Sequence, residues 1–278
     1  MTRPADEEGT TVTGTTTSAG GAYRPRPGAA PVARMIAAQA ALETRMLLRH
    51  GEQLLLTVVI PTLVLVLFSV VEIVDVPVAT AGGEGTRVDF LAPGVLALAV
   101  LSTAFTGQAI STGFERRYGV LKRLGASPLP RWALMTAKTC AVLVTELLQV
   151  LLLTAVAFGL GWSPQGGWLA VVLLLVAGTA AFSGLGLLMA GTLRAEATLA
   201  GANLLFILLL VGGGVIVPLS RFPGPVQAVL ELLPVSALSD GLRQVLQHGA
   251  GLPWADLGVL AVWAVAGLGA AARFFRWE

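Results

Sequence analysis

Long runs of apolar residues recur along the chain, and shorter polar segments separate them. Each run has about 20 residues or more, which at 1.5 Å of helical rise per residue is enough to cross the roughly 30 Å hydrocarbon core of a bilayer. The pattern therefore predicts an all-α integral membrane protein. The six predicted transmembrane helices cover residues 54–74, 91–113, 133–160, 168–193, 199–219 and 254–272.

The sequence before the first apolar run divides into two parts. Residues 1–31 are rich in Thr, Gly, Ala and Pro, so we expect a disordered tail ahead of a membrane domain over residues 32–278. Residues 32–49 have arginines on one side of a helix and apolar side chains on another, and Gln39 and Glu43 interrupt the apolar side. This imperfect amphipathicity predicts an N-terminal interfacial helix, with a plain helical extension in the cytoplasm as the alternative.

A basic segment at residues 114–132 separates the second and third apolar runs. Drawn as a helix over residues 114–124, it places Phe114, Tyr118 and Leu121 on one stripe with the cations on its flanks. Its five basic residues are Arg116, Arg117, Lys122, Arg123 and Arg131. The segment suits docking to a cytoplasmic partner, but an ordinary loop whose cations only fix the topology has the same charge.

Charge distribution gives the expected orientation. Charged residues make up only 12% of the chain and the net charge is +2, so the positions of the cations carry the information. They concentrate before the first run, in residues 114–132, and after the sixth run. The positive-inside rule therefore places both termini and this segment in the cytoplasm, as in a multi-pass protein of the cytoplasmic membrane.

The segment at residues 220–253, before the last apolar run, is expected on the outer side. Residues 226–233 and 236–247 are predicted to form short helices separated by Pro234, and Ser239 and Asp240 offer capping oxygens. These helices are too short to span and too apolar to be free loops. They fit outer re-entrant or interfacial helices, which either close the mouth of a pathway or only pack against the spans.

The usual catalytic and cofactor-binding motifs are absent from the sequence. There is no phosphate-binding GxxxxGK[ST] loop, no hydrolase elbow and no HExxH motif, and the chain has two histidines and one cysteine. We therefore expect no catalytic residue, no bound metal and no cofactor in this chain. Since the basic segment adjoins the membrane and lacks a supporting fold, membrane lipid is an expected partner and nucleic acid is not.

Polar residues inside apolar runs are the remaining candidates for function. Glu146 lies in the third predicted span with Gln149 one turn further on the same face, while Gln108 and Asn203 lie in the second and fifth spans. They either line a pathway or form hydrogen bonds between packed helices. Lys138 lies nearer the cytoplasmic end, where we expect it to snorkel to the interface.

Small residues in the fourth predicted span indicate close helix contacts there rather than a substrate site. They are Gly178, Ala180, Gly184, Gly186 and Gly191.

Two motifs resemble one family of membrane transport proteins. The sequence ERRYGVLKRL at residues 115–124, followed by ASPLPR at 126–131, resembles the cytoplasmic loop of type-2 ABC transporter permeases, in particular the daunorubicin-resistance class of exporters. A second set resembles the segment before the last span of that class. It consists of VPLS at 217–220, FP at 222–223, LP at 233–234 and DGLR at 240–243.

This resemblance implies a permease subunit of an ATP-driven exporter, not an enzyme by itself. Two permease subunits, identical or different, would form the pathway, and separate ABC ATP-binding subunits would bind ATP and Mg²⁺. In such permeases the loop after the second span is the coupling helix that meets the ATPase. Carried onto this chain, the docking candidates are Phe114, Glu115, Arg116, Tyr118, Leu121, Lys122 and Arg123. The outer gate candidates are Pro218, Pro223, Pro234, Asp240 and Arg243.

The sequence departs from the family at Arg117, where members often have an acid, and at Val120, where they often have Thr. The family exports drugs, lipids and glycan carriers, so the resemblance names no cargo. A proton-coupled secondary transporter using Glu146 is the alternative function. A membrane enzyme, a scaffold, and an immunity protein that binds a drug without moving it are further hypotheses.

Overall fold

A computed structural model describes residues 30–49, 51–71, 79–80, 83–125, 129–215, 219 and 222–275 of the chain. The predicted disordered tail lies outside these residues, apart from Ala30 and Pro31. Of the outer gate candidates, Pro218 also lies outside them.

The described chain is helical, apart from one antiparallel pair of two-residue strands, β1 (Ala79–Thr80) and β2 (Gly83–Glu84). The helices of the first part of the chain are α1 (Val32–Arg49), α2 (Gly51–Val70), α3 (Arg87–Val100), η1 (Leu101–Gly107), α4 (Gln108–Arg117) and α5 (Val120–Gly125). Those that follow are α6 (Arg131–Gly159), α7 (Trp168–Thr192), α8 (Ala195–Gly212), α9 (Gly224–Leu230), α10 (Pro234–Leu246) and α11 (Trp254–Phe274).

Five helical segments of the described chain are long and apolar enough to cross a membrane. They are Arg87–Arg117, Trp132–Gly159, Trp168–Thr192, Ala195–Gly212 and Trp254–Phe274. The first of them joins α3, η1 and α4 into one continuous helix through a π-helical stretch. The span predicted at residues 54–74 corresponds to α2, whose described apolar part, Thr57–Val70, is a shorter helix.

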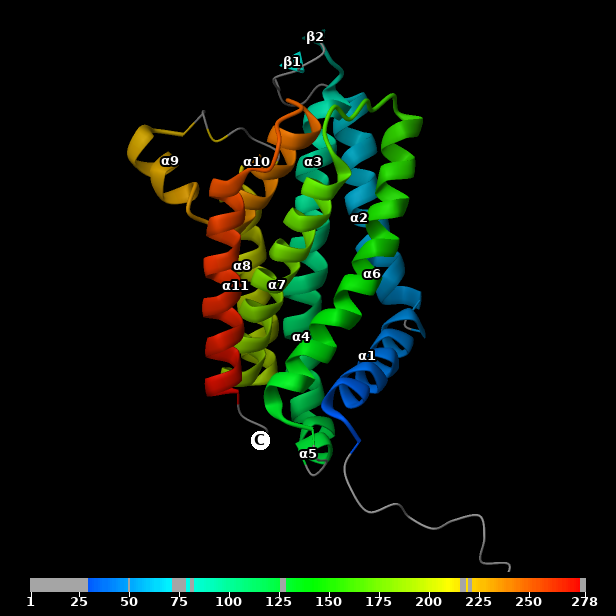
Figure 1. Ribbon diagram of the computed structural model, residues 1–278, viewed down its shortest axis with the longest axis vertical. Helices are drawn as coiled ribbons and strands as arrows, with labels where there is room; N and C mark the ends of the chain where they lie inside the picture. The colour runs from blue at the N-terminus through cyan, green and yellow to red at the C-terminus, as the bar shows by residue number, and fades with distance from the viewer. Residues whose placement is uncertain are drawn as a thin grey trace, which may run out of the picture. The chain divides into compact units, whose positions relative to one another are not determined.

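Helices α3, η1, α4 and α7 form the interior of the bundle. The apolar part of the Arg87–Arg117 segment is 89% buried, and α7 packs against α11, α4, η1 and α10. Phe105, Phe182, Leu174 and Leu238 are fully buried where these helices meet. Figure 1 shows α8 and α11 on one side of this interior, and α2 and α6 on the other.

Glycines bring α7 into backbone contact with its neighbours. A Cβ atom added to Gly184 would lie 2.6 Å from the backbone nitrogen of Leu268 and 2.8 Å from the carbonyl carbon of Gly267, both on α11. One added to Gly186 would lie 2.8 Å from the backbone oxygen of Phe105. Any larger residue would push these helices apart, so the small residues serve close packing, as the sequence predicted.

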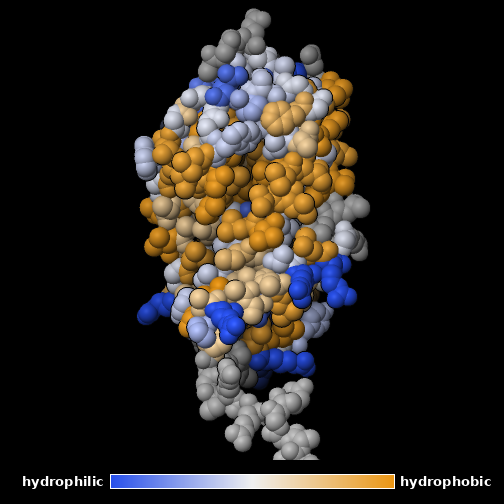
Figure 2. All heavy atoms as spheres, turned by 45° about the vertical axis from the view of Figure 1, so that its right-hand side comes forward, coloured by the Kyte–Doolittle hydropathy of each residue, from blue (hydrophilic) through white to orange (hydrophobic). Residues whose placement is uncertain are grey.

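The outer faces of the bundle are apolar. Large side chains such as Ile60, Leu151, Leu169, Leu208 and Val265 are more than half exposed. Figure 2 shows a hydrophobic band around the middle of one face, with hydrophilic residues above and below it. An apolar band of this kind is expected where helices face lipid.

The prediction of one helix over residues 114–124 is wrong. Helix α4 runs out of the bundle to Arg117, the chain then turns at Tyr118 and Gly119, and α5 begins at Val120. Gly119 adopts φ +72°, a left-handed conformation that ends a helix at little cost for glycine. The Phe114 and Arg116 carbonyls accept hydrogen bonds from the amides of Tyr118 and Gly119, which closes the end of α4.

The two short helices expected between residues 220 and 253 differ in their packing. Pro234 begins α10 instead of separating two helices, because proline fits the first turn. Helix α10 packs against α3, α7 and α11, whereas α9 has no buried residue. The expected capping by Ser239 is wrong, since its hydroxyl donates to the Gly213 backbone oxygen at 2.8 Å and so fixes α10 to the end of α8.

Candidate functional site

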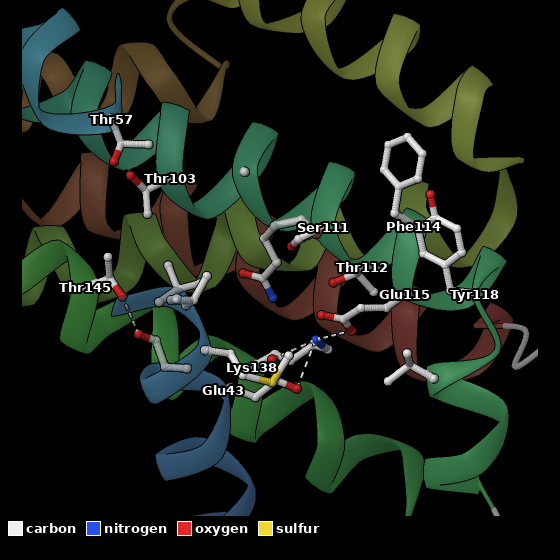
Figure 3. A pocket seen from close by; sticks show the side chains of 17 residues that line it. Glu43, Thr57, Thr103, Ser111, Thr112, Phe114, Glu115, Tyr118, Lys138 and Thr145 are labelled. Carbon is white, nitrogen blue, oxygen red and sulfur yellow. Dashed lines mark hydrogen bonds and ion pairs between the residues drawn. The ribbon is translucent and has the colours of Figure 1, made fainter. Parts of the chain in front are cut away.

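A cavity of about 430 Å³ lies between α1, α4 and α6. Glu43 of α1, Glu115 of α4 and Lys138 of α6 line it, together with Gln108 and Thr112 of α4. Figure 3 shows Glu43, Glu115 and Lys138 meeting in this cavity from three different helices. A concave site with apolar walls and a few converging polar groups is the usual form of a binding site for a small molecule.

The three charged residues form a buried cluster. The Lys138 ammonium group donates to Glu115 Oε2 at 2.7 Å and to the Glu43 carboxylate at 3.1 Å. Gln39 donates a further hydrogen bond to Glu43 at 2.9 Å. The Lys138 side chain is 5% exposed and that of Glu43 is 10% exposed, so water screens this cluster weakly. The cluster fastens α1 to α4 and α6.

The expectation that Lys138 snorkels to the interface is wrong. The side chain turns inward because two carboxylates from other helices are within reach there. Sequence reasoning also treated Glu43 as an interruption of the apolar face of α1, and Glu115 as part of a docking surface. A lysine inside the apolar run of residues 133–160 was the available signal, because a buried cation needs an acidic partner, but one sequence does not show which helices are neighbours.

Buried amides and hydroxyls connect the spans deeper in the bundle. Gln149 of α6 accepts a hydrogen bond from Thr103 at 2.9 Å and donates to the Thr57 backbone oxygen at 2.6 Å. Thr179 of α7 donates to the Glu146 carboxylate. The amide oxygen of Gln108 accepts a hydrogen bond from Ser183 at 2.8 Å. These bonds join α6 to η1, α2 and α7, and α4 to α7.

The four polar candidates within the spans do not converge on one site. Gln108 lines the cavity, whereas Glu146 and Gln149 lie further along α6 and are not among its lining residues. Asn203 lies apart from them, exposed on α8. Among the described residues, one oxygen of Glu146 and the amide nitrogen of Gln108 are buried without a hydrogen-bond partner.

The docking candidates divide into exposed and buried groups. Tyr118 is 71% exposed, its ring stacks on Phe114 with centroids 6.2 Å apart, and Lys122 and Arg123 are exposed on α5. We call Tyr118, Lys122 and Arg123 the α5 surface. Figure 1 shows α5 at the end of the bundle opposite α9 and α10.

The remaining docking candidates face the protein. Leu121 is fully buried and packs in a cluster with Leu129, Leu134 and Phe275. Arg116 donates to the backbone oxygens of Ala190 and Leu193, each at 2.9 Å, so it holds the end of α7. With Glu115 paired to Lys138, these three side chains stabilise the base of the segment.

Arg117, where the sequence departs from the family pattern, has a partner within this chain. Its guanidinium group forms an ion pair with Glu196 in the first turn of α8, and both side chains are more than half exposed. An exposed pair contributes little stability. The pair nevertheless places the carboxylate of Glu196 from α8 beside the basic segment.

At the opposite end of the bundle, Arg243 fixes α10. Its guanidinium group donates to the Val215 backbone oxygen at 2.8 Å and to Asp240 at 3.2 Å, and it lies 4.1 Å from the centre of the Phe90 ring. Burial raises the pKa of Asp240, and the nearby charge of Arg243 partly offsets this. Pro223 precedes α9 and Pro234 begins α10. Asp240, Arg243 and Pro234 therefore hold a buried helix across this end.

Within the described ranges, no group of three or more His, Cys, Asp or Glu side chains is arranged to hold a metal ion. The arrangement is that of a polytopic helical membrane protein with a mainly apolar cavity that contains a buried charged cluster, and with an exposed basic end.

The sequence profile of the ABC-2 type transporter family matches residues 38–246, well over half of the 278 residues. The chain therefore belongs to this family, which confirms the predicted type-2 ABC permease relationship and makes the chain a transport component. The match extends from α1 to the last residue of α10, so it includes the cavity and both motifs. Comparison with curated protein sequences finds no significant match.

Proposed function

We propose that this chain is the permease subunit of an ATP-driven exporter in the cytoplasmic membrane. The match of residues 38–246 to the ABC-2 type transporter family carries this proposal. In the proposed arrangement α2 is the first of six spans, both termini and α5 are cytoplasmic, α1 lies in the interface, and α9 and α10 lie on the outer side. Two permease subunits form the pathway, and separate subunits bind ATP and Mg²⁺.

The α5 surface is the proposed docking site for the ATP-binding subunit. Tyr118 presents an exposed aromatic ring, and Lys122 and Arg123 present two exposed cations. Aromatic and arginine side chains contribute a large share of the binding energy in protein interfaces. The matching surface of the partner is therefore expected to be acidic, with a pocket for the Tyr118 ring.

The continuous helix of α3, η1 and α4 is the proposed route from ATP hydrolysis to the pathway. It ends two residues before α5, and Arg116 joins its last turn to the end of α7. The π-helical η1 lies in its middle, and such stretches are frequent at functional sites. Movement of a docked α5 would shift this helix as one element between two packings.

Capture of the tagged protein in mild detergent tests the docking site. We expect an ATPase to co-purify with the wild type. The Tyr118→Ala, Arg123→Glu double variant should co-purify with roughly a tenth of this amount of ATPase or less, because two side chains that contact the partner are lost. The matched control is the Trp254→Ala, Glu231→Lys variant, whose exposed residues lie near the other end of the bundle. It should retain the partner fully.

The same capture can exclude the proposal. A wild-type protein expressed in its own host that brings down no ATPase would contradict it. Equal loss in both variants would remove the α5 surface as the docking site. Membrane insertion of each variant is measured in parallel, so that misfolding is recognised.

The proton-coupled alternative rests on one observation. The Glu146 carboxylate is buried, and one of its oxygens has no hydrogen-bond partner in the described part of the chain.

The cargo proposed for the ATP-driven exporter is a drug, a lipid or a glycan-linked molecule. Export of a drug would give antibiotic resistance.

Efflux of a drug cargo from cells distinguishes the two mechanisms, and daunorubicin is the first drug to test. We expect efflux to continue in cells that retain ATP while an ionophore collapses the proton gradient, and to be kept by the Glu146→Gln variant. Efflux that stops with the gradient and is lost in this variant would favour the proton-coupled transporter.

A further inference from the structure

The cavity between α1, α4 and α6 contains buried polar groups that the fold does not satisfy. Within the described residues, the amide nitrogen of Gln108 and the hydroxyl of Thr112 have no hydrogen-bond partner. Gln108 is 4% exposed, Thr112 is fully buried, and both line the cavity. An unpaired buried donor is unfavourable, and a ligand that accepts a hydrogen bond from it removes this cost.

The cavity also has an excess of negative charge. Its charged lining residues are Glu43, Glu115 and Lys138, so two carboxylates face one ammonium group, with a formal sum of −1. The ammonium group of Lys138 already interacts with both oxygens of Glu43 and with Oε2 of Glu115. An uncompensated charge in a poorly screened site is unfavourable, so the cavity favours a ligand with one positive charge.

The walls between these polar groups are apolar. Met46, Leu47, Phe114 and Val142 line the cavity, and Met46 is 43% exposed at its edge on α1. Figure 3 shows Phe114 and Tyr118 at one side of the cavity and the charged cluster at a distance from them. A ligand that fills this space therefore has an apolar body as well as a charged group.

We propose that this cavity binds a monocationic amphipathic small molecule. Its ammonium group lies beside Glu43 and Glu115, a hydrogen-bond acceptor on its body meets the amide nitrogen of Gln108, and its apolar part packs on Leu47, Val142 and Phe114. Binding here does not require an ATPase partner, so its failure is separate from failure of the proposed function. Its role as the cargo site of an exporter rests on that function.

The test uses dansylcadaverine, a fluorescent primary amine whose sulfonyl oxygens accept hydrogen bonds. The full chain is placed in nanodiscs of phosphatidylcholine, and dansyl emission is titrated. We expect saturable binding with a blue-shifted emission. The N-acetylated compound is neutral and dansyl-6-aminohexanoate is anionic. Each lacks the ammonium group, so the affinity of each should be at least about tenfold lower than that of dansylcadaverine.

Variants of the protein separate the cavity from unspecific partition into lipid. Glu43→Gln, which removes the excess charge, and Gln108→Leu, which removes the donor, should each raise the Kd for dansylcadaverine roughly tenfold. Their matched controls are Glu231→Gln on the exposed outer segment and Gln247→Leu, a buried amide at the end of α10 that does not line the cavity. Both controls should keep the wild-type Kd.

Two outcomes would overturn the proposal. One is equal binding of the three dansyl compounds by the wild type, which needs no variant to fold. The other is an unchanged Kd in folded Glu43→Gln and Gln108→Leu proteins. If Glu43→Gln fails to fold, Gln108→Leu and the three compounds decide the result.

Discussion

Replacement of Lys138 by methionine is expected to lower the free energy of unfolding by about 3–5 kcal/mol. The change leaves Glu43 and Glu115 buried near one another without the ammonium group that lies 3.1 Å and 2.7 Å from them. Breaking a buried ion pair by removing one partner is costly, because the remaining charges stay out of water. Unfolding by increasing fractions of SDS in dodecylmaltoside micelles, followed by tryptophan fluorescence, measures this change.

Two further variants test the cause of this loss. Lys122→Met makes the same substitution on the exposed face of α5 and is expected to change stability by less than about 0.5 kcal/mol. Combining Lys138→Met with Glu43→Gln and Glu115→Gln should recover most of the lost stability, since uncharged groups of similar size replace all three charges. A triple variant as unstable as Lys138→Met alone would show that packing, not charge, explains the loss.

Substitution of Gly184 by alanine is expected to lower the free energy of unfolding by about 1–3 kcal/mol, although alanine favours helices. The added methyl group would lie 2.6 Å from the backbone nitrogen of Leu268 on α11, and a backbone atom moves only with its helix. The same SDS titration measures the effect.

Gly269→Ala on α11 is the control for this substitution, since an added Cβ atom there meets nothing within 4 Å. It is expected to leave stability unchanged or to raise it by up to about 1 kcal/mol, the helix preference of alanine over glycine. If Gly184→Ala behaved in the same way, the close α7–α11 contact would have no energetic role.

The sequence predicts most of the long apolar helices well, because apolar runs of bilayer length are typical of membrane-spanning helices and rare elsewhere. The run expected at 199–219 is an exception, since its helix is Ala195–Gly212 and the chain turns after it. The predicted run 168–193 corresponds to Trp168–Thr192, and 254–272 corresponds to Trp254–Phe274. The hydropathy pattern does not predict a helix break that depends on the backbone conformation of one residue. The break at Gly119 separates α4 from α5, although the periodicity of Phe114, Tyr118 and Leu121 fits one helix equally well.

The sequence singled out only part of the candidate site, and it did not predict the contacts between its members. Gln108 was identified because an amide in an apolar span is unusual, and it does line the cavity. The contacts of Lys138 with Glu43, 95 positions away, and Glu115, 23 positions away, depend on which helices pack together. A hydropathy pattern gives the depth of a residue in the membrane, but it does not give the neighbour that a side chain meets.

The attachment of α1 by Glu43 determines where a shortened version of this protein should begin. A boundary chosen by hydropathy would fall at the first apolar run, near residue 54, and would delete Glu43 together with the rest of α1. Lys138 would then keep Glu115 as its partner and lose the contact at 3.1 Å, and the face of α6 that α1 covers would be open. The smallest unit with an intact interior therefore includes the whole amphipathic helix from Val32 onward, rather than beginning at the first apolar run.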